Sequence, residues 1–197
     1  MILPNQLTVL RIILSPVFLY LFLSSNELMQ QISLGVYLVA AFSDWYDGWL
    51  ARKYNFITAW GKFWDPLADK ILTAAAFVGF VYLGVLSFWL VLLVVLRDFT
   101  ITLFRGYTDS IGIEFTTSRY AKVKTFAQMV FIYYLLIVYI LSKNSFLSKN
   151  YGDIFAILLN QTFILIMMII VTFITVHSGI LYFTDNKPAM KKLFKKQ

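Results

Sequence analysis

Four aspartates stand close together in a chain that is otherwise strongly apolar. They are Asp44, Asp47, Asp65 and Asp69, and the whole chain of 197 residues has only 10 acidic residues. The members of each pair are three or four positions apart, so each pair lies on one face of its segment if that segment is helical. Carboxylates gathered in this way repel one another unless a cation lies between them, and Mg²⁺ prefers oxygen ligands of this kind. The spacing therefore predicts a site for one or two divalent ions.

The residues around the aspartates suit an anionic ligand. Gly48 and Ala51 leave one helix face bare, so that a ligand or another helix can come close. Arg52 supplies a planar cation suited to phosphate, and Gly61 leaves the linking segment free to turn. Together these features predict a site for a polyanion such as a diphosphate. Ordinary loop ion pairs would explain one aspartate, but they leave four at paired helical spacing unexplained.

The composition predicts a single integral membrane domain over residues 1–197. The chain is 60% hydrophobic and only 14% charged, with a mean hydropathy of +0.75, whereas about a quarter of a soluble domain is charged. The net charge of +7 does not indicate nucleic-acid binding, because the basic residues lie between apolar stretches. The absence of cysteine excludes disulfides and thiolate chemistry. The N-terminus lacks the pattern of a cleavable signal, so we expect the first helix to remain.

We expect an all-α polytopic membrane protein with six transmembrane helices, because six stretches approach the roughly 20 residues that a bilayer requires. These stretches cover residues 7–24, 31–50, 66–82, 87–107, 119–141 and 153–183. Arg and Lys gather beyond the second, fourth and sixth stretches, so the positive-inside rule places both termini and the aspartates on the cytoplasmic side. Asp65 either caps the third helix, with Pro66 in its first turn, or Pro66 bends a helix that begins earlier. The lysine-rich residues 187–196 are expected to contact anionic lipid headgroups.

A second group of basic residues surrounds the cytoplasmic ends of the fourth and fifth stretches. Its members are Arg97, Arg105, Arg119, Lys122 and Lys124. Arg97 and Arg105 are eight positions apart, which places them near one helix face. Such a cluster suits the phosphate of a second substrate. The alternative is a topology signal combined with pairing between Arg97 and its neighbour Asp98.

The aspartate window reads D-x2-D-G-x2-A-R-x8-G-x3-D-x3-D from Asp44 to Asp69. This pattern resembles the signature of the CDP-alcohol phosphotransferase family. The segments 4–11 and 121–129 are similar to the first and fifth helices of the phosphatidylglycerophosphate synthase branch. In the first of these, the similar residues are Pro4, Asn5, Leu7, Thr8 and Arg11. Many members of that branch have Arg-Glu-Trp where this chain has Arg105-Gly106-Tyr107, so the resemblance is weaker there.

The resemblance implies a homodimer in a bacterial inner membrane, with an active site that faces the cytoplasm. It implies transfer of the phosphatidyl group from CDP-diacylglycerol to sn-glycerol 3-phosphate, with CMP as the leaving group. It also implies dependence on Mg²⁺ or Mn²⁺, with two ions bound. Two alternatives stay open: the same chemistry with inositol phosphate, serine or phosphatidylglycerol as acceptor, or a cation transporter. A transporter would place its site near the membrane midplane, often between repeats, and the sequence contains no repeat.

The resemblance further implies a role for each residue of the window. Asp44, Asp47 and Asp65 hold metal, and Asp69 is both a further ligand and the general base that takes the acceptor's proton. The nucleotide and diphosphate contact a larger group: Asn5, Asp44, Asp47, Gly48, Ala51, Arg52 and Gly61.

Overall fold

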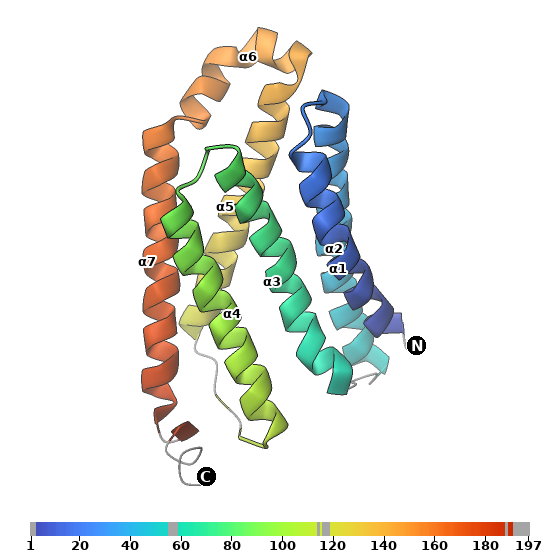
Figure 1. Cartoon of the computed structure of the whole chain (residues 1–197), viewed down its shortest axis with the longest axis vertical. Coiled ribbons are helices and arrows are strands. Elements are labelled where there is room, and N and C mark those ends of the chain that lie inside the picture. Colours follow the sequence, from blue (N-terminus) through green and yellow to red (C-terminus); the bar gives the residue numbers. More distant parts are fainter. Residues whose placement is uncertain (1–2, 55–58, 114, 116–118, 188, 191–197) are drawn as a thin grey trace.

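The chain folds into a bundle of long helices, which confirms the predicted all-α class. The computed structural model describes residues 3–54, 59–113, 115, 119–187 and 189–190. The helices of these residues are α1 (Leu3–Phe22), α2 (Glu27–Tyr54), α3 (Ala59–Tyr82), α4 (Phe88–Ser110), α5 (Arg119–Lys143), α6 (Ser145–Leu158) and α7 (Gln161–Asp185) (Figure 1).

Helix α1 lies at one side of the bundle, where it packs on both α2 and α3 (Figure 1). Helix α3 then packs on α4, α4 on α7, and α5 on both α7 and α2. The short helix α6 crosses the upper end of the bundle between α5 and α7 (Figure 1). Helix α1 begins toward the lower end in this view and α7 ends there. The start of the first described helix and the end of the last therefore lie on the same side of the bundle.

An aromatic core holds α1 against its neighbours. Phe18 and Phe22 of α1 are fully buried, as are Phe80 of α3 and Leu135 of α5. The rings of Phe22 and Phe80 lie 5.1 Å apart, edge to face, which is a favourable geometry for aromatic pairs. This packing holds the C-terminal half of α1 against α3. It thereby also positions the N-terminal half of α1, which carries the polar residues Thr8 and Arg11.

Helix α3 begins earlier than the apolar stretch at residue 66 indicated. It starts at Ala59, so the second of the two alternatives holds: Asp65 does not cap the helix, and Pro66 lies inside it. Gly61 accordingly belongs to the first turn of α3 and not to a linking loop. The apolar run of the sequence begins only after Asp65, so the first turns of α3, from Ala59 to Asp65, were not recognised as helical from the sequence. Stacking of Trp60 on Trp64, at 5.8 Å between ring centroids, supports them.

The sixth predicted stretch, 153–183, was also wrong, because it spans two helices. Asn160 lies between α6 and α7, and its side chain accepts hydrogen bonds from the backbone N–H groups of Thr162 and Phe163, at 3.0 and 3.2 Å. This is the usual way in which an N-cap satisfies the first donors of a helix. The apolar residues on both sides of Asn160 concealed the break in the sequence.

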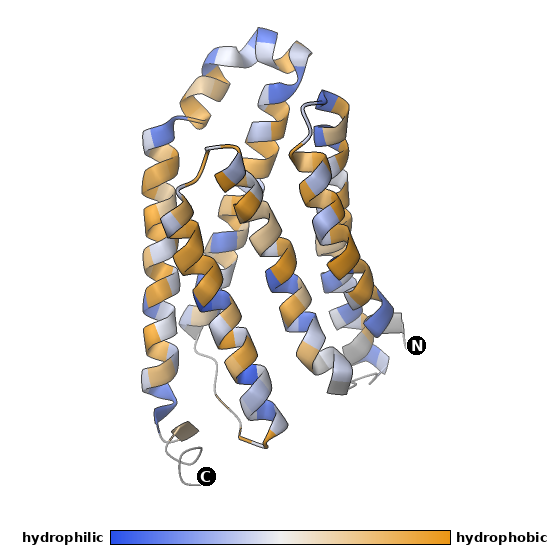
Figure 2. Cartoon of the chain, viewed as in Figure 1, coloured by the Kyte–Doolittle hydropathy of each residue, from blue (hydrophilic) through white to orange (hydrophobic). Residues whose placement is uncertain are grey.

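Three of the described helices are long and apolar enough to cross a membrane by length and composition. They are α1, α5 and α7, over Asn5–Phe22, Tyr120–Lys143 and Gln161–Asp185. Helices α2, α3 and α4 fall short because they contain the charged residues of the predicted sites, seen as blue positions along α3 and α4 in Figure 2. The prediction of six spans and of cytoplasmic termini therefore stays a prediction.

Candidate active site

Arg11 of α1 lies between two of the four aspartates. Its two terminal nitrogens contact different carboxylates, Nη1 at 2.5 Å from Oδ1 of Asp44 and Nη2 at 2.7 Å from Oδ2 of Asp47. Arg11 is fully buried and Asp47 is nearly so, whereas the side chain of Asp44 is 41% exposed. One guanidinium therefore neutralises part of the α2 pair from a neighbouring helix, through a hydrogen bond to Asp47 and an ion pair with Asp44.

Thr8, one turn before Arg11, contacts the third aspartate. Its hydroxyl donates a hydrogen bond to Oδ1 of Asp65 on α3. Since Thr8 and Arg11 are three positions apart, they lie on the same face of α1. The sequence predicted that α2 and α3 would face their carboxylates toward each other. The structure adds α1, whose polar face contacts the carboxylates of both helices.

Asp69 is paired with a lysine. The ammonium group of Lys70 lies 2.8 Å from Oδ2 of Asp69, and both side chains are largely buried. The negative charges of Asp65 and Asp69 act on Asp44, so the two pairs share one electrostatic environment. The negative charges of Asp69 and Asp44 also act on the phenol of Tyr133 on α5. The four aspartates of the window thus form one anionic cluster.

This cluster suits a divalent cation by its donor chemistry and its charge. Among the residues that the structure describes, no three His, Cys, Asp or Glu side chains lie close enough together to hold a metal ion, and Arg11 already bridges two of the aspartates. Among the described side chains, however, Arg11 pairs with Asp44 and Asp47 and Lys70 pairs with Asp69, so four carboxylates face two cations. Carboxylate oxygen is the ligand that Mg²⁺ prefers. The residues therefore fit a divalent ion by the chemistry of their donors, although the described side chains are not gathered into a metal-binding group in this structure.

A second charged cluster surrounds Asp98 on α4. The buried carboxylate of Asp98 pairs with Arg97 at 3.1 Å and with the ammonium group of Lys124 on α5. Arg97 also donates to the hydroxyl of Ser178 on α7, at 2.7 Å. Two cations against one carboxylate leave this cluster with a positive charge, which suits an anion. Arg97 and Lys124 were predicted from the sequence, Asp98 was predicted only as an alternative partner of Arg97, and Ser178 was not predicted.

The remaining residues of the predicted phosphate site do not join this cluster. The side chain of Arg105 is about half exposed and lies 3.9 Å from Asp109. Lys122 is exposed on α5. The side chain of Arg119 lies outside the described residues, although its backbone begins α5. Arg97 thus contacts α7 and Arg105 the next turn of its own helix, while the charges of both act on Tyr182 of α7.

The predicted nucleotide residues lie near the anionic cluster along the chain. Asn5 and Gly48 are half-buried on α1 and α2, and Gly61 is buried in α3. The side chains of Ala51 and Arg52 lie outside the described residues, although both belong to α2. Gly106, where the resemblance weakens, packs closely on α3: a Cβ atom there would lie 3.0 Å from Cδ2 of Phe63. Close helix packing thus accounts for glycine at this position.

Comparison of the sequence with known proteins shows which proteins the chain is similar to. A family model described as CDP-alcohol phosphatidyltransferase matches residues 1–175. A relative from Rickettsia typhi is 33% identical over 185 residues, which cover 94% of this chain and 97% of the relative. A relative from Bacillus subtilis is 30% identical over 201 residues, which cover 96% of this chain and 97% of the relative. Both relatives are named CDP-diacylglycerol–glycerol-3-phosphate 3-phosphatidyltransferase, and these matches confirm the resemblance seen in the aspartate window.

Proposed function

Because the chain belongs to the CDP-alcohol phosphatidyltransferase family, we propose that it makes phosphatidylglycerophosphate. In the proposed reaction, a hydroxyl oxygen of sn-glycerol 3-phosphate forms a bond to the phosphatidyl phosphorus of CDP-diacylglycerol. The bond from that phosphorus to the CMP oxygen breaks, and CMP leaves. The names of the relatives support both substrates. The observation that carries the proposal is the ion pair between Asp69 and Lys70, because the ammonium group of Lys70 is also attracted by the charge of Asp98 in the cationic cluster.

The anionic cluster is the proposed site of the metal and the diphosphate. Asp44, Asp47 and Asp65 would hold Mg²⁺ or Mn²⁺, as one or two ions, with Asp69 as a further ligand. The bound metal supplies neutralisation of the charge that develops on the diphosphate as CMP departs. Members of this family generally depend on a divalent metal ion. The nucleotide residues of this proposal are Asn5, Gly48, Ala51, Arg52 and Gly61.

Asp69 is the proposed general base, and the cluster around Asp98 is the proposed acceptor site. A hydroxyl is a poor nucleophile until a base removes its proton. Asp69 is the aspartate of the window whose partner, Lys70, is also attracted by the charge of Asp98 in the cationic cluster. Arg97 and Lys124 would bind the phosphate of glycerol 3-phosphate. Asp69 would then meet the acceptor's hydroxyl at the other end of the same small molecule.

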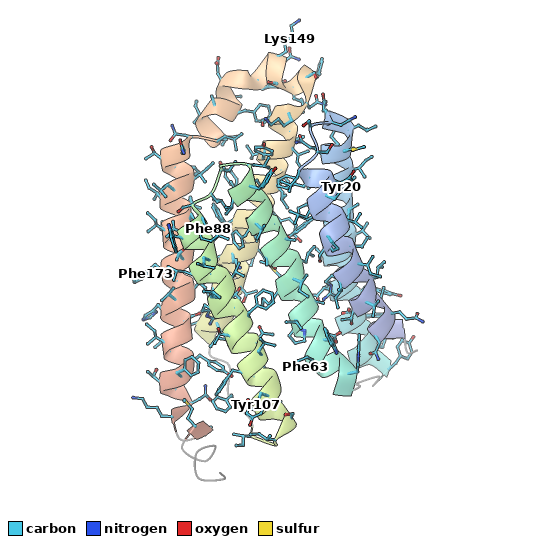
Figure 3. The ribbon with its side chains drawn as sticks, in the orientation of Figure 1. Tyr20, Phe63, Phe88, Tyr107, Lys149 and Phe173 are labelled. Carbon is cyan, nitrogen blue, oxygen red and sulfur yellow. The ribbon has the colours of Figure 1, made fainter. Side chains whose placement is uncertain are left out.

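Six membrane crossings, by α1–α5 and α7, remain part of the proposal, with the aspartates near the cytoplasmic surface of a bacterial inner membrane. Two exposed tyrosines support it, since Tyr and Trp gather at both surfaces of a membrane. Figure 3 labels Tyr107 toward the lower end of the bundle and Tyr20 in its upper half. Their side chains are 52% and 74% exposed. Helix α3 begins at the same lower end (Figure 1), so the site would open near the depth of the lipid headgroups. A homodimer is proposed from the family resemblance alone.

The test is a radiolabel assay with purified protein in detergent or in vesicles. Labelled glycerol 3-phosphate and CDP-diacylglycerol should give labelled phosphatidylglycerophosphate when Mg²⁺ or Mn²⁺ is present and none when a chelator is added. Unlabelled inositol phosphate, serine and phosphatidylglycerol serve as competitors in parallel. Product formation that persists in chelator would contradict the metal site. Efficient competition by one of the other acceptors would reassign the second substrate.

A further inference from the structure

One face of α1 carries a row of buried polar side chains. Thr8, Arg11 and Ser15 are each at most 1% exposed, although they belong to an apolar helix. They are three and four positions apart, so they form a single row. Burial of such groups is costly unless they are hydrogen-bonded or paired. Ser15 is satisfied within its own helix by the carbonyl oxygen of Arg11, at 2.8 Å, whereas Thr8 and Arg11 reach across to other helices.

Thr8 and Arg11 contact their aspartates in the same way. Each of the three aspartates proposed as metal ligands is held through one of its two oxygens. Arg11 contacts Oδ1 of Asp44 and Oδ2 of Asp47, and Thr8 contacts Oδ1 of Asp65. Asp69, the proposed base, is held instead by Lys70 of its own helix. The helix α1 thus distinguishes the three proposed ligands from the base.

The geometry points to Thr8 and Arg11 as positioning residues that hold one oxygen of Asp44, Asp47 and Asp65 so that the other oxygen of each can bind a divalent cation. This inference rests on the metal site proposed above. It assigns to α1 a task that neither α2 nor α3 performs alone, because the carboxylates come from two helices and α1 is packed on both. Groups that orient metal ligands in this way typically affect metal affinity by about 10–100-fold.

The contribution of Arg11 differs from that of a simple positive charge. Its guanidinium spans two carboxylates with two separate nitrogens, which an ammonium group at the end of a flexible chain cannot reproduce with the same geometry. A change from Arg11 to Lys therefore keeps the charge beside the metal site and removes the fixed spacing. Any loss of metal affinity then reports on positioning rather than on a change in the net charge of the site.

The experiment measures Mn²⁺ binding to the full-length protein in detergent by electron paramagnetic resonance, which needs neither substrate nor turnover. Thr8→Val removes the hydroxyl at nearly constant shape, and we expect the Mn²⁺ affinity to fall about tenfold or more. Thr8→Ser restores the hydroxyl and should restore the affinity. Arg11→Lys should also weaken binding by about tenfold. Ser15→Ala is the matched control, because it removes a buried hydroxyl of the same row that contacts only α1, and its affinity should equal that of the wild type.

Thermal unfolding in the presence of chelator accompanies each titration, so that a misfolded variant is recognised. Should Arg11→Lys fail to fold, the pair Thr8→Val and Thr8→Ser decides alone. Mn²⁺ binding by the wild type together with unchanged affinity in folded Thr8→Val would overturn the positioning role and leave the proposed function intact. No Mn²⁺ binding by the wild type would overturn the metal site of the proposed function, and the positioning role with it.

Discussion

Lys70 connects the two charged clusters of the bundle through its contact with Asp69. The two groups lie 2.8 Å apart, and the same ammonium group is attracted by the carboxylate of Asp98 on α4. An anionic cluster formed by α1, α2 and α3 is thereby joined to a cationic cluster formed by α4, α5 and α7. A metal-bound diphosphate and an acceptor phosphate need sites of these opposite charges at a short distance from each other.

The first prediction concerns Asp69 as general base. Asp69→Asn keeps the size of the side chain and removes its ability to take a proton, so turnover should fall by about 10²–10⁴-fold. The change is measured as kcat with labelled glycerol 3-phosphate. Asp153→Asn is the control, because Asp153 is an exposed acid on α6, and this variant should retain full turnover. Full turnover by Asp69→Asn would exclude Asp69 as the base.

The anionic cluster could be predicted in part from the sequence, because helical spacing is a local property. The intervals between Asp44 and Asp47 and between Asp65 and Asp69 placed each pair on one face of α2 or α3. Arg11 lies 36 positions from Asp47, and only the tertiary packing of α1 brings them together. A signal was present nonetheless: an arginine inside an apolar helix requires a partner, and it follows Thr8 at helical spacing.

The cationic cluster was harder to predict, because the sequence does not show which way a charged side chain turns. Arg97 and Arg105 share a helix and a periodicity. Arg97 reaches Ser178 on α7, 81 positions away, whereas Arg105 stays near the exposed Asp109. Arg97 and Arg105 find different partners because Ser178 of α7 lies beside the turn of α4 that carries Arg97. Spacing alone could therefore indicate a basic region but not the members of a site.

The second prediction concerns the acceptor site. Lys124→Met removes a buried charge that is proposed to bind the acceptor's phosphate, while Arg97 still neutralises Asp98. Charge-assisted hydrogen bonds contribute about 1.5–3 kcal/mol, so the KM for glycerol 3-phosphate should rise by about tenfold or more. The KM for CDP-diacylglycerol should not change. Lys149→Met, at an exposed lysine of α6, is the control, and an equal rise in both KM values of Lys124→Met would contradict a specific acceptor role.

The third prediction concerns the buried carboxylate of Asp98. Asp98→Asn leaves Arg97 and Lys124 as two neighbouring cations without their shared partner. Loss of one partner from a buried ion pair costs about 3–5 kcal/mol of stability, which should lower the thermal midpoint of unfolding in detergent. The double variant Asp98→Asn with Lys124→Met removes one of these cations. It should be less destabilised than the sum of the two single variants, and simple additivity would show that the pair is not coupled.

The last prediction concerns the close approach of α1 and α3 at Gly79. A Cβ atom at this position would lie 2.8 Å from Cδ1 of Phe22, and the fully buried ring of Phe22 is already packed against Phe18, Phe80 and Tyr139. Gly79→Ala should therefore lower the free energy of unfolding by about 1–3 kcal/mol, as overpacked cores do. The matched control is Gly35→Ala in α2, where no atom lies within 4 Å of the new Cβ. There, alanine should stabilise the helix by about 0.5–1 kcal/mol.

Thermal unfolding in detergent compares the two glycine variants directly, and opposite signs are expected. Displacement of Phe22 also moves α1, the helix that carries Thr8 and Arg11, relative to α3, which carries Asp65. Gly79→Ala should therefore weaken Mn²⁺ binding as well, whereas Gly35→Ala should leave it unchanged. A Gly79→Ala variant as stable as the wild type would show that α1 and α3 are not in close contact where Phe22 meets Gly79. The bundle would then not hold the polar face of α1 against the carboxylates.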